Sequence, residues 1–340
     1  MMRNSRPGAL RRFRRETAAA LVGYVVLLTI AELIVTYVNP VLVFPLHGGL
    51  ILLVITYVMV HFSAERHDPE HIALFIVLIL GPLIRIISLT LPLGQIEPAY
   101  RYLFAGIPMA VAAVIAARAV GLPRRQMGLA WSKWRWQVLV ILAAFPIGFI
   151  EFAVLSPDPI GPPAWTLAGL TPALALGFFT GFPEELIFRG IMQTVTRPFL
   201  GRWNWIYVSV IFAVLHIGYQ SYIDVVFVFA AGLLYGWVVE RTRSIIGVSI
   251  SHGLANVVLF FVAPHVIDSG LVPPIGPQLQ WGTAILSVIG IAVAGYYISK
   301  SVIAESRRRR SQRRTTNDAR VKPDAPRAPQ DPEVARVSWR

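Results

Sequence analysis

The chain has 340 residues, of which 55% are hydrophobic and only 14% charged, and it contains no cysteine. This composition indicates a membrane protein with many apolar helices, and it excludes disulfides, thiolate nucleophiles and cysteine-ligated metals. The net charge of +13 lies in the termini and in alternate loops. Such a distribution favours contacts with anionic lipid headgroups over binding of nucleic acid.

Ten apolar stretches follow one another along the chain, each close to or somewhat shorter than the ~20 residues that cross a bilayer. They cover residues 17–38, 42–62, 71–92, 101–120, 136–155, 164–182, 204–217, 223–240, 245–263 and 282–303. We therefore predict an all-α fold, a polytopic integral membrane helical bundle with ten transmembrane helices.

The positions of Lys and Arg predict how this bundle is oriented in the membrane. Lys and Arg occur before the first stretch and after the second, fourth, sixth, eighth and tenth. The opposite loops, 39–41, 92–100, 156–163, 218–222 and 264–281, contain neither. The positive-inside rule then predicts that both termini are cytoplasmic. The first apolar run is too long for a cleaved signal peptide and is expected to be a transmembrane helix.

Glu184 and Glu185 stand directly after the sixth apolar stretch. A carboxylate at membrane depth costs roughly 2.5–3.5 kcal/mol on insertion scales, so it is kept mainly where it forms a pair or takes part in chemistry. Gly181 and Pro183 predict a break in the helix before the pair, with a cavity beside the break. Because Glu184 ends an inward-going span, we expect the site to lie toward the cytoplasmic side.

Further polar residues follow at helical spacing. Glu185 and Arg189 are four residues apart and are expected to form an ion pair on one helix face. His252 and Asn256 are also four apart, and His216 ends an apolar run. These residues lie on three predicted helices, so they can meet only around a common polar cavity.

The residue types suit hydrolysis of a peptide bond. A carboxylate can take a proton from water, a histidine can orient that water, and a histidine and an amide can donate hydrogen bonds to an oxyanion. A serine-hydrolase Gly-x-Ser-x-Gly motif is missing, and Asp224 lacks an evident partner aspartate.

A metal site is the alternative for the same residues. Glu184, His216 and His252 would supply a His₂Glu zinc set. The His-Glu-x-x-His signature is missing, however, and Asn256 suits an oxyanion donor better than a zinc ligand. We therefore expect no metal and no other cofactor, with zinc on these three residues as the alternative.

Three motifs occur in a fixed order, Glu184-Glu185-x-x-x-Arg189, Phe212-x-x-x-His216 and His252-x-x-x-Asn256. Through them the chain resembles the CPBP intramembrane proteases, which include the CAAX prenyl endopeptidases of the Rce1 type and the bacterial Abi proteins. The likeness covers about 125–265. The family has been described both as metal-dependent and as glutamate-type.

The resemblance implies a role for each motif residue. Glu184 would be the general base, and His216 would help to hold the attacking water. His252 and Asn256 would form the oxyanion site, and Glu185 and Arg189 would be a supporting pair.

Four regions follow from the spans and the resemblance. They are a basic cytoplasmic N-terminus (1–16), an N-terminal four-helix transmembrane region (17–122), a CPBP-like catalytic transmembrane core (123–305) and a disordered basic cytoplasmic tail (306–340).

The predicted function is that of an intramembrane endopeptidase acting on a membrane-associated peptide or protein, with a prenylated CAAX-type substrate as one option. We expect a multi-pass protein of the cell membrane whose partners are lipids and this substrate, without nucleic acid. One alternative is a non-proteolytic membrane scaffold or immunity protein. Another is a proton-coupled transporter, which predicts broken helices in two related halves, whereas the sequence predicts one break.

Other charged residues lie within spans one, three and five, namely Glu32, Arg85 and Glu151. Arg85 is expected to pair with one of the two carboxylates inside the bundle. All three are predicted to be structural and not part of the site.

Overall fold

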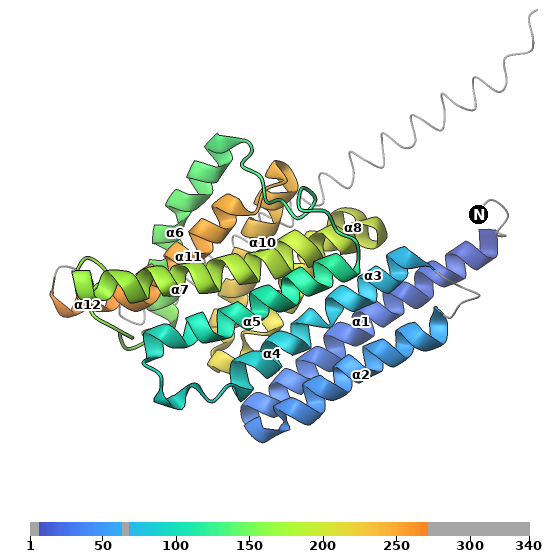
Figure 1. Ribbon diagram of the computed structural model, residues 1–340, viewed down its shortest axis with the longest axis horizontal. Coiled ribbons are helices and arrows are strands. Elements are labelled where there is room, and N and C mark those ends of the chain that lie inside the picture. Colours follow the sequence, from blue (N-terminus) through green and yellow to red (C-terminus); the bar gives the residue numbers. More distant parts are fainter. Residues whose placement is uncertain (1–6, 63–67, 271–340) are drawn as a thin grey trace, which may run out of the picture. The chain divides into compact units, whose positions relative to one another are not determined.

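The computed structural model describes residues 7–62 and 68–270. By its internal contacts the chain divides into two units, residues 1–291 and 292–340, and all described residues belong to the first. Every regular element among these residues is helical, which confirms the predicted all-α class (Figure 1).

The α-helices are α1 (Pro7–Tyr37), α2 (Val43–His61), α3 (Pro69–Leu78), α4 (Leu80–Thr90), α5 (Pro98–Ala119), α6 (Trp134–Leu155), α7 (Leu167–Glu185), α8 (Gln193–Leu200), α9 (Asn204–Val214), α10 (Tyr222–Thr242), α11 (Ile246–Val257) and α12 (Ala263–Asp268). Short 3-10 turns are η1 (Pro40–Leu42), η3 (Leu93–Gln95), η5 (Gly201–Trp203) and η6 (Ile217–Tyr219). Two segments are π-helical, η4 (Leu186–Met192) and η7 (Val258–Val262).

Eight helical segments of the described chain are long and apolar enough to cross a membrane. Seven of them correspond one to one with predicted spans. The predicted sixth and seventh spans fall together in the remaining segment, Leu167–Tyr219. The tenth span, the tail from 306 and the side on which the termini lie fall outside the described residues or are not tested by them, so the count of ten and the orientation stay predictions.

The predicted helix break at Gly181–Pro183 is wrong. Helix α7 continues through Pro183 to Glu185 and passes directly into η4 and α8. Glu184 therefore lies within a continuous helical segment and not after a helix break; the expectation that it ends a membrane span stays a prediction. Proline cannot donate a hydrogen bond to the carbonyl four residues earlier. That carbonyl, of Phe179, instead faces Gly106 of α5, where a Cβ atom would overlap it.

Gly181 has a packing role and not a hinge role. A Cβ atom there would overlap the Ser249 carbonyl oxygen and lie 2.6 Å from the Gly253 backbone nitrogen. A Cβ atom at Gly177, one turn earlier, would lie 3.3 Å from the Gly253 carbonyl oxygen. Small residues at such spacing let two helix backbones approach closely. Helices α7 and α11 therefore lie against each other, with α5 on the other side of α7 (Figure 1).

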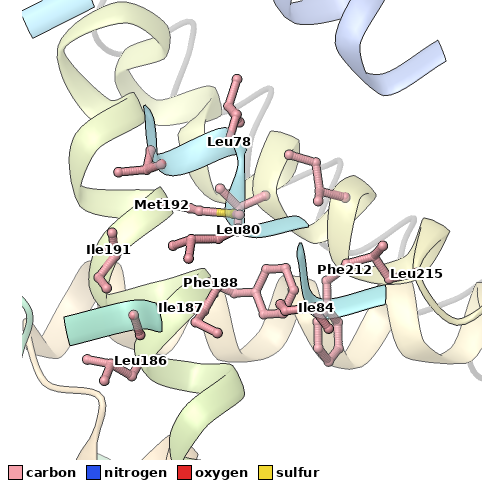
Figure 2. Close-up of a cluster of buried hydrophobic side chains, with 14 of the residues drawn as sticks. Leu78, Leu80, Ile84, Leu186, Ile187, Phe188, Ile191, Met192, Phe212 and Leu215 are labelled. Atoms are coloured by element: carbon pink, nitrogen blue, oxygen red, sulfur yellow. The ribbon is translucent and has the colours of Figure 1, made fainter. Parts of the chain in front are cut away.

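The N-terminal helices pack against the segment that follows α7. Figure 2 shows Leu78, Leu80 and Ile84 of the α3–α4 region beside the η4 side chains and Phe212 of α9. Helix α1 joins them through two hydrogen bonds. Tyr24 Oη donates to the Leu78 carbonyl at 2.7 Å, and Tyr207 Oη donates to the Leu21 carbonyl at 3.0 Å.

The expected intramembrane pairing of Arg85 is present. Its Nε donates to Glu32 Oε1 at 2.7 Å, and the Glu32 side chain is fully buried. His47 Nε2 lies 3.5 Å from the same oxygen. Glu151 is not joined to Arg85 and lies elsewhere in the bundle.

Candidate active site

One polar cavity lies among α5, α6, α7, α9, α10 and α11. Its volume is about 60 Å³, which is room for a few water molecules. Its polar lining comprises Tyr102, Glu151, Thr180, Glu184, His216, Tyr219, Tyr235, His252 and Asn256. The structure thus brings Glu184, His216, His252 and Asn256 to the wall of a single cavity.

The two adjacent glutamates have different surroundings. Glu184 lines the cavity, and its side chain is 24% exposed. Glu185 is fully buried and accepts a hydrogen bond from Arg189 Nη1 at 2.9 Å, which is the ion pair expected from the four-residue spacing. Successive helical residues point about 100° apart, so one carboxylate reaches the cavity and the other reaches the protein interior.

Arg189 contacts three different helical segments through its guanidinium group. Besides Glu185, its Nη2 donates to the Gly232 carbonyl at 3.4 Å, and its guanidinium lies 4.3 Å from the centre of the Phe212 ring. A Cβ atom at Gly232 would lie 3.2 Å from Nη2. A glycine there therefore lets α10 come close enough for its backbone to accept this hydrogen bond.

His252 connects both glutamates. Its Nδ1 lies 3.0 Å from Glu185 Oε1, and its Nε2 lies 3.8 Å from Glu184 Oε2. A carboxylate beside Arg189 can only accept, so Nδ1 carries the hydrogen of that bond. Nε2 is then the nitrogen that faces Glu184 and the cavity.

Asn256 lies one turn further along α11. Its Nδ2 donates to Thr180 Oγ1 at 2.9 Å, and Thr180 in turn donates to the Leu176 carbonyl at 2.8 Å. An amide group carries two N–H bonds. One is used to fix the side chain on α7, and the second is left for another acceptor.

His216 follows the end of α9. Its Nδ1 lies 2.8 Å from the Phe212 carbonyl oxygen, which only accepts, so Nδ1 is the donor and Nε2 has a free lone pair in the neutral ring. The ring lies against Phe212 at 4.7 Å and against Tyr219 at 5.8 Å between centroids. Phe212 thus contacts both His216 and Arg189.

Part of the cavity lining lies outside the site that the sequence predicts. Glu151 was predicted to be structural, yet it lines the cavity together with Glu184. Tyr102, Thr180, Tyr219 and Tyr235 also line the cavity and lie outside the predicted site. A carboxylate within an apolar span indicates a functional site. Glu151 has this feature just as Glu184 does.

The metal alternative can be judged from the donor set. Within residues 7–62 and 68–270, no group of three or more His, Asp or Glu side chains is arranged to hold one metal ion. Glu184, His216 and His252 share a cavity wall, but they do not form such a group in the described part of the chain. The geometry therefore does not fit the His₂Glu set.

These features define a multi-pass helical membrane protein in which a glutamate, two histidines and an asparagine line one cavity between the helices. Residues 164–258 match a family model described as type II CAAX prenyl endopeptidase Rce1-like. The chain therefore carries an Rce1-like domain, and the resemblance inferred from the three motifs is confirmed over these residues. The match supports the class of intramembrane endopeptidase. Neither a curated protein nor a solved structure matched the chain.

Proposed function

We propose that the protein is an intramembrane endopeptidase in which Glu184 activates water for attack on a peptide bond. The observation that carries this proposal is the shared cavity of Glu184, His216, His252 and Asn256. These side chains supply a general base, a second contact for the water and two hydrogen-bond donors, which are the groups that the reaction needs.

In the first step, a Glu184 oxygen takes a proton from water as the water oxygen bonds to the carbonyl carbon. The free Nε2 lone pair of His216 accepts a hydrogen bond from the same water and orients it. The Phe212 carbonyl fixes this tautomer, because it holds the hydrogen on Nδ1.

The carbonyl oxygen then carries negative charge. The second N–H of Asn256 donates to it, and so does Nε2 of His252 when that ring holds a proton on both nitrogens. As the tetrahedral intermediate collapses, the C–N bond breaks and the proton passes from Glu184 to the leaving nitrogen. Glu184 returns to the carboxylate form.

We propose that no metal takes part. The donor geometry described above supports this, and each step can be assigned to a side chain. Zinc bound by Glu184, His216 and His252 would require these groups to move together.

The substrate class is proposed from the family description and the cavity lining. The matched family is described as CAAX prenyl endopeptidases, so prenylated C-terminal peptides are the first substrates to test. Apolar side chains such as Ile147, Phe227 and Leu259 line the remaining wall. Because the cavity is much smaller than a peptide, substrate entry requires neighbouring helices to separate.

The test is cleavage of fluorogenic peptides by the full chain in lipid vesicles. The panel holds a prenylated CAAX peptide, the same peptide without the prenyl group, and apolar peptides embedded in the vesicle membrane. We expect cleavage of at least one of them, with the same rate with and without a metal chelator.

Two results would contradict parts of this proposal. Loss of activity with chelator and recovery with zinc would overturn the metal-free mechanism. Failure of the folded protein to cleave any peptide would overturn the endopeptidase assignment and favour a scaffold or a transporter.

A further inference from the structure

The turn after α9 determines where His216 lies. Helix α9 ends at Val214, the chain passes through η6, and Gln220 has a left-handed backbone with φ of 58°. The His216 ring has contacts with Phe212 before the turn and Tyr219 within it. A shift of this turn would therefore move the imidazole relative to Glu184.

Two N-terminal helices cover the turn from outside the matched domain. Helix α1 packs on η6 and on α9. From α4, the Arg85 guanidinium lies against Gly218, where a Cβ atom would be 2.8 Å from Nη2 and 3.6 Å from the guanidinium carbon. Gly218 is two residues after His216, so this contact acts on the turn itself.

Arg85 is itself fixed. Its Nε donates to Glu32 Oε1 at 2.7 Å, and the Arg85 side chain is 13% exposed and that of Glu32 0%. A buried charge at membrane depth is costly without its partner. The pair therefore joins α1 to α4 and presents a planar guanidinium to the turn in one orientation.

We propose that the Glu32–Arg85 ion pair positions His216 by holding the turn at Gly218, so that the N-terminal helices contribute to hydrolysis. This inference rests on the proposed function, because it assigns Arg85 as a positioning residue for the histidine that orients the attacking water. A purely structural pair would stabilise the bundle without changing turnover.

The kinetic test compares Arg85→Met, Arg85→Lys and Gly218→Ala with the wild type on a cleaved peptide. Arg85→Met is expected to lower kcat about 10- to 100-fold with an unchanged KM, as for a misplacement of about 1 Å at a reacting group. Arg85→Lys keeps the charge but not the planar group and should lose less. Gly218→Ala leaves the ion pair residues intact and should lower kcat because its methyl group displaces the guanidinium.

Double variants separate positioning from stability. In an Arg85→Met background, Gly218→Ala should have no further effect, because the overlap is gone. In a His216→Ala background, Arg85→Met should leave the residual kcat unchanged. The control is Arg197→Met, which removes an ion pair to Glu240 away from the turn and should leave kcat as in the wild type. An equal loss of kcat from Arg85→Met with and without His216 would overturn the proposal.

A spectroscopic measurement keeps this inference distinct from the proposed function. The chain has seven histidines, and selective ¹⁵N-histidine labelling with His216→Gln as reference identifies the His216 signal. We expect that signal to shift in Arg85→Met and Gly218→Ala but not in Arg197→Met. An unchanged signal would overturn the positioning role, whereas absence of any cleavage by the wild type would overturn only the endopeptidase function.

Discussion

Glu185 joins two other residues of the site, because its Oε1 atom accepts hydrogen bonds from both Arg189 and His252. The two distances are 2.9 and 3.0 Å, and both Glu185 and Arg189 are fully buried. The spacing of four residues predicted the first bond. The second joins residues 67 positions apart, and no local pattern in the sequence indicates it.

Glu185→Gln should therefore destabilise the protein strongly. The substitution keeps the shape of the side chain but leaves Arg189 as a buried charge without its carboxylate, which costs about 3–5 kcal/mol. Thermal unfolding in detergent measures the effect. The control is Glu240→Gln, whose ion pairs with Arg197 and Arg243 are partly exposed and should be worth about 0–1 kcal/mol. Equal melting temperatures for the two variants would contradict this account.

Asn256 is expected to act on the transition state. Asn256→Ala removes an oxyanion donor and should lower kcat about 100- to 1000-fold with little change in KM. Thr180→Val removes the hydroxyl that orients the amide and leaves the amide itself in place, so it should cause a smaller loss. Steady-state kinetics on one peptide compare the two. A rise in KM with an unchanged kcat for Asn256→Ala would place this residue in substrate binding instead.

At the scale of elements, close contact of α7 with α11 sets the site geometry. Gly177 and Gly181 of α7 meet Gly253 of α11, and the bonded residues Thr180 and Asn256 lie beside this contact. From the sequence alone Gly181 and Pro183 predict a helix break, because glycine and proline also mark helix ends. Whether Gly181 ends a helix or packs against another helix depends on α11, which lies about 70 residues further along the chain.

Gly181→Ala should disturb this contact. Its methyl group would overlap the Ser249 carbonyl oxygen, a backbone atom that cannot turn away, and overpacking of this kind costs about 1–3 kcal/mol. Gly23→Ala in α1 is the matched control, because nothing lies within 4 Å of the added atom and alanine favours a helix by about 1 kcal/mol. Melting temperatures should fall for Gly181→Ala and stay level or rise for Gly23→Ala. The opposite order would contradict the inferred helix contact.

At the scale of the whole molecule, the motifs located the chemistry but not the full cavity. Glu184, His216, His252 and Asn256 could be chosen from the sequence because each stands in a short local motif and the three motifs together resemble the CPBP proteases. Tyr102 and Glu151 line the same cavity from α5 and α6, outside residues 164–258. Their place depends on how these helices pack on α7 and α11, which composition and spacing do not specify.

The predicted membrane orientation can be tested over the whole chain. Because the chain has no cysteine, single cysteines can be introduced into each loop and labelled with a membrane-impermeant reagent. We expect labelling from the cytoplasmic side at residues 120–133 and from the opposite side at residues 92–97 and 156–163, as the distribution of Lys and Arg predicts. Labelling of both groups from the same side would contradict the proposed topology.

The most direct test of the central claim is the rate of peptide cleavage by Glu184→Gln beside the wild type in vesicles. The substitution keeps the size of the side chain and removes its ability to take a proton from water, a contribution of about 100- to 10,000-fold. We predict such a loss of kcat, with wild-type folding and with activity of the wild type unaffected by chelator. Cleavage by Glu184→Gln at the wild-type rate would contradict the assignment of Glu184 as the base.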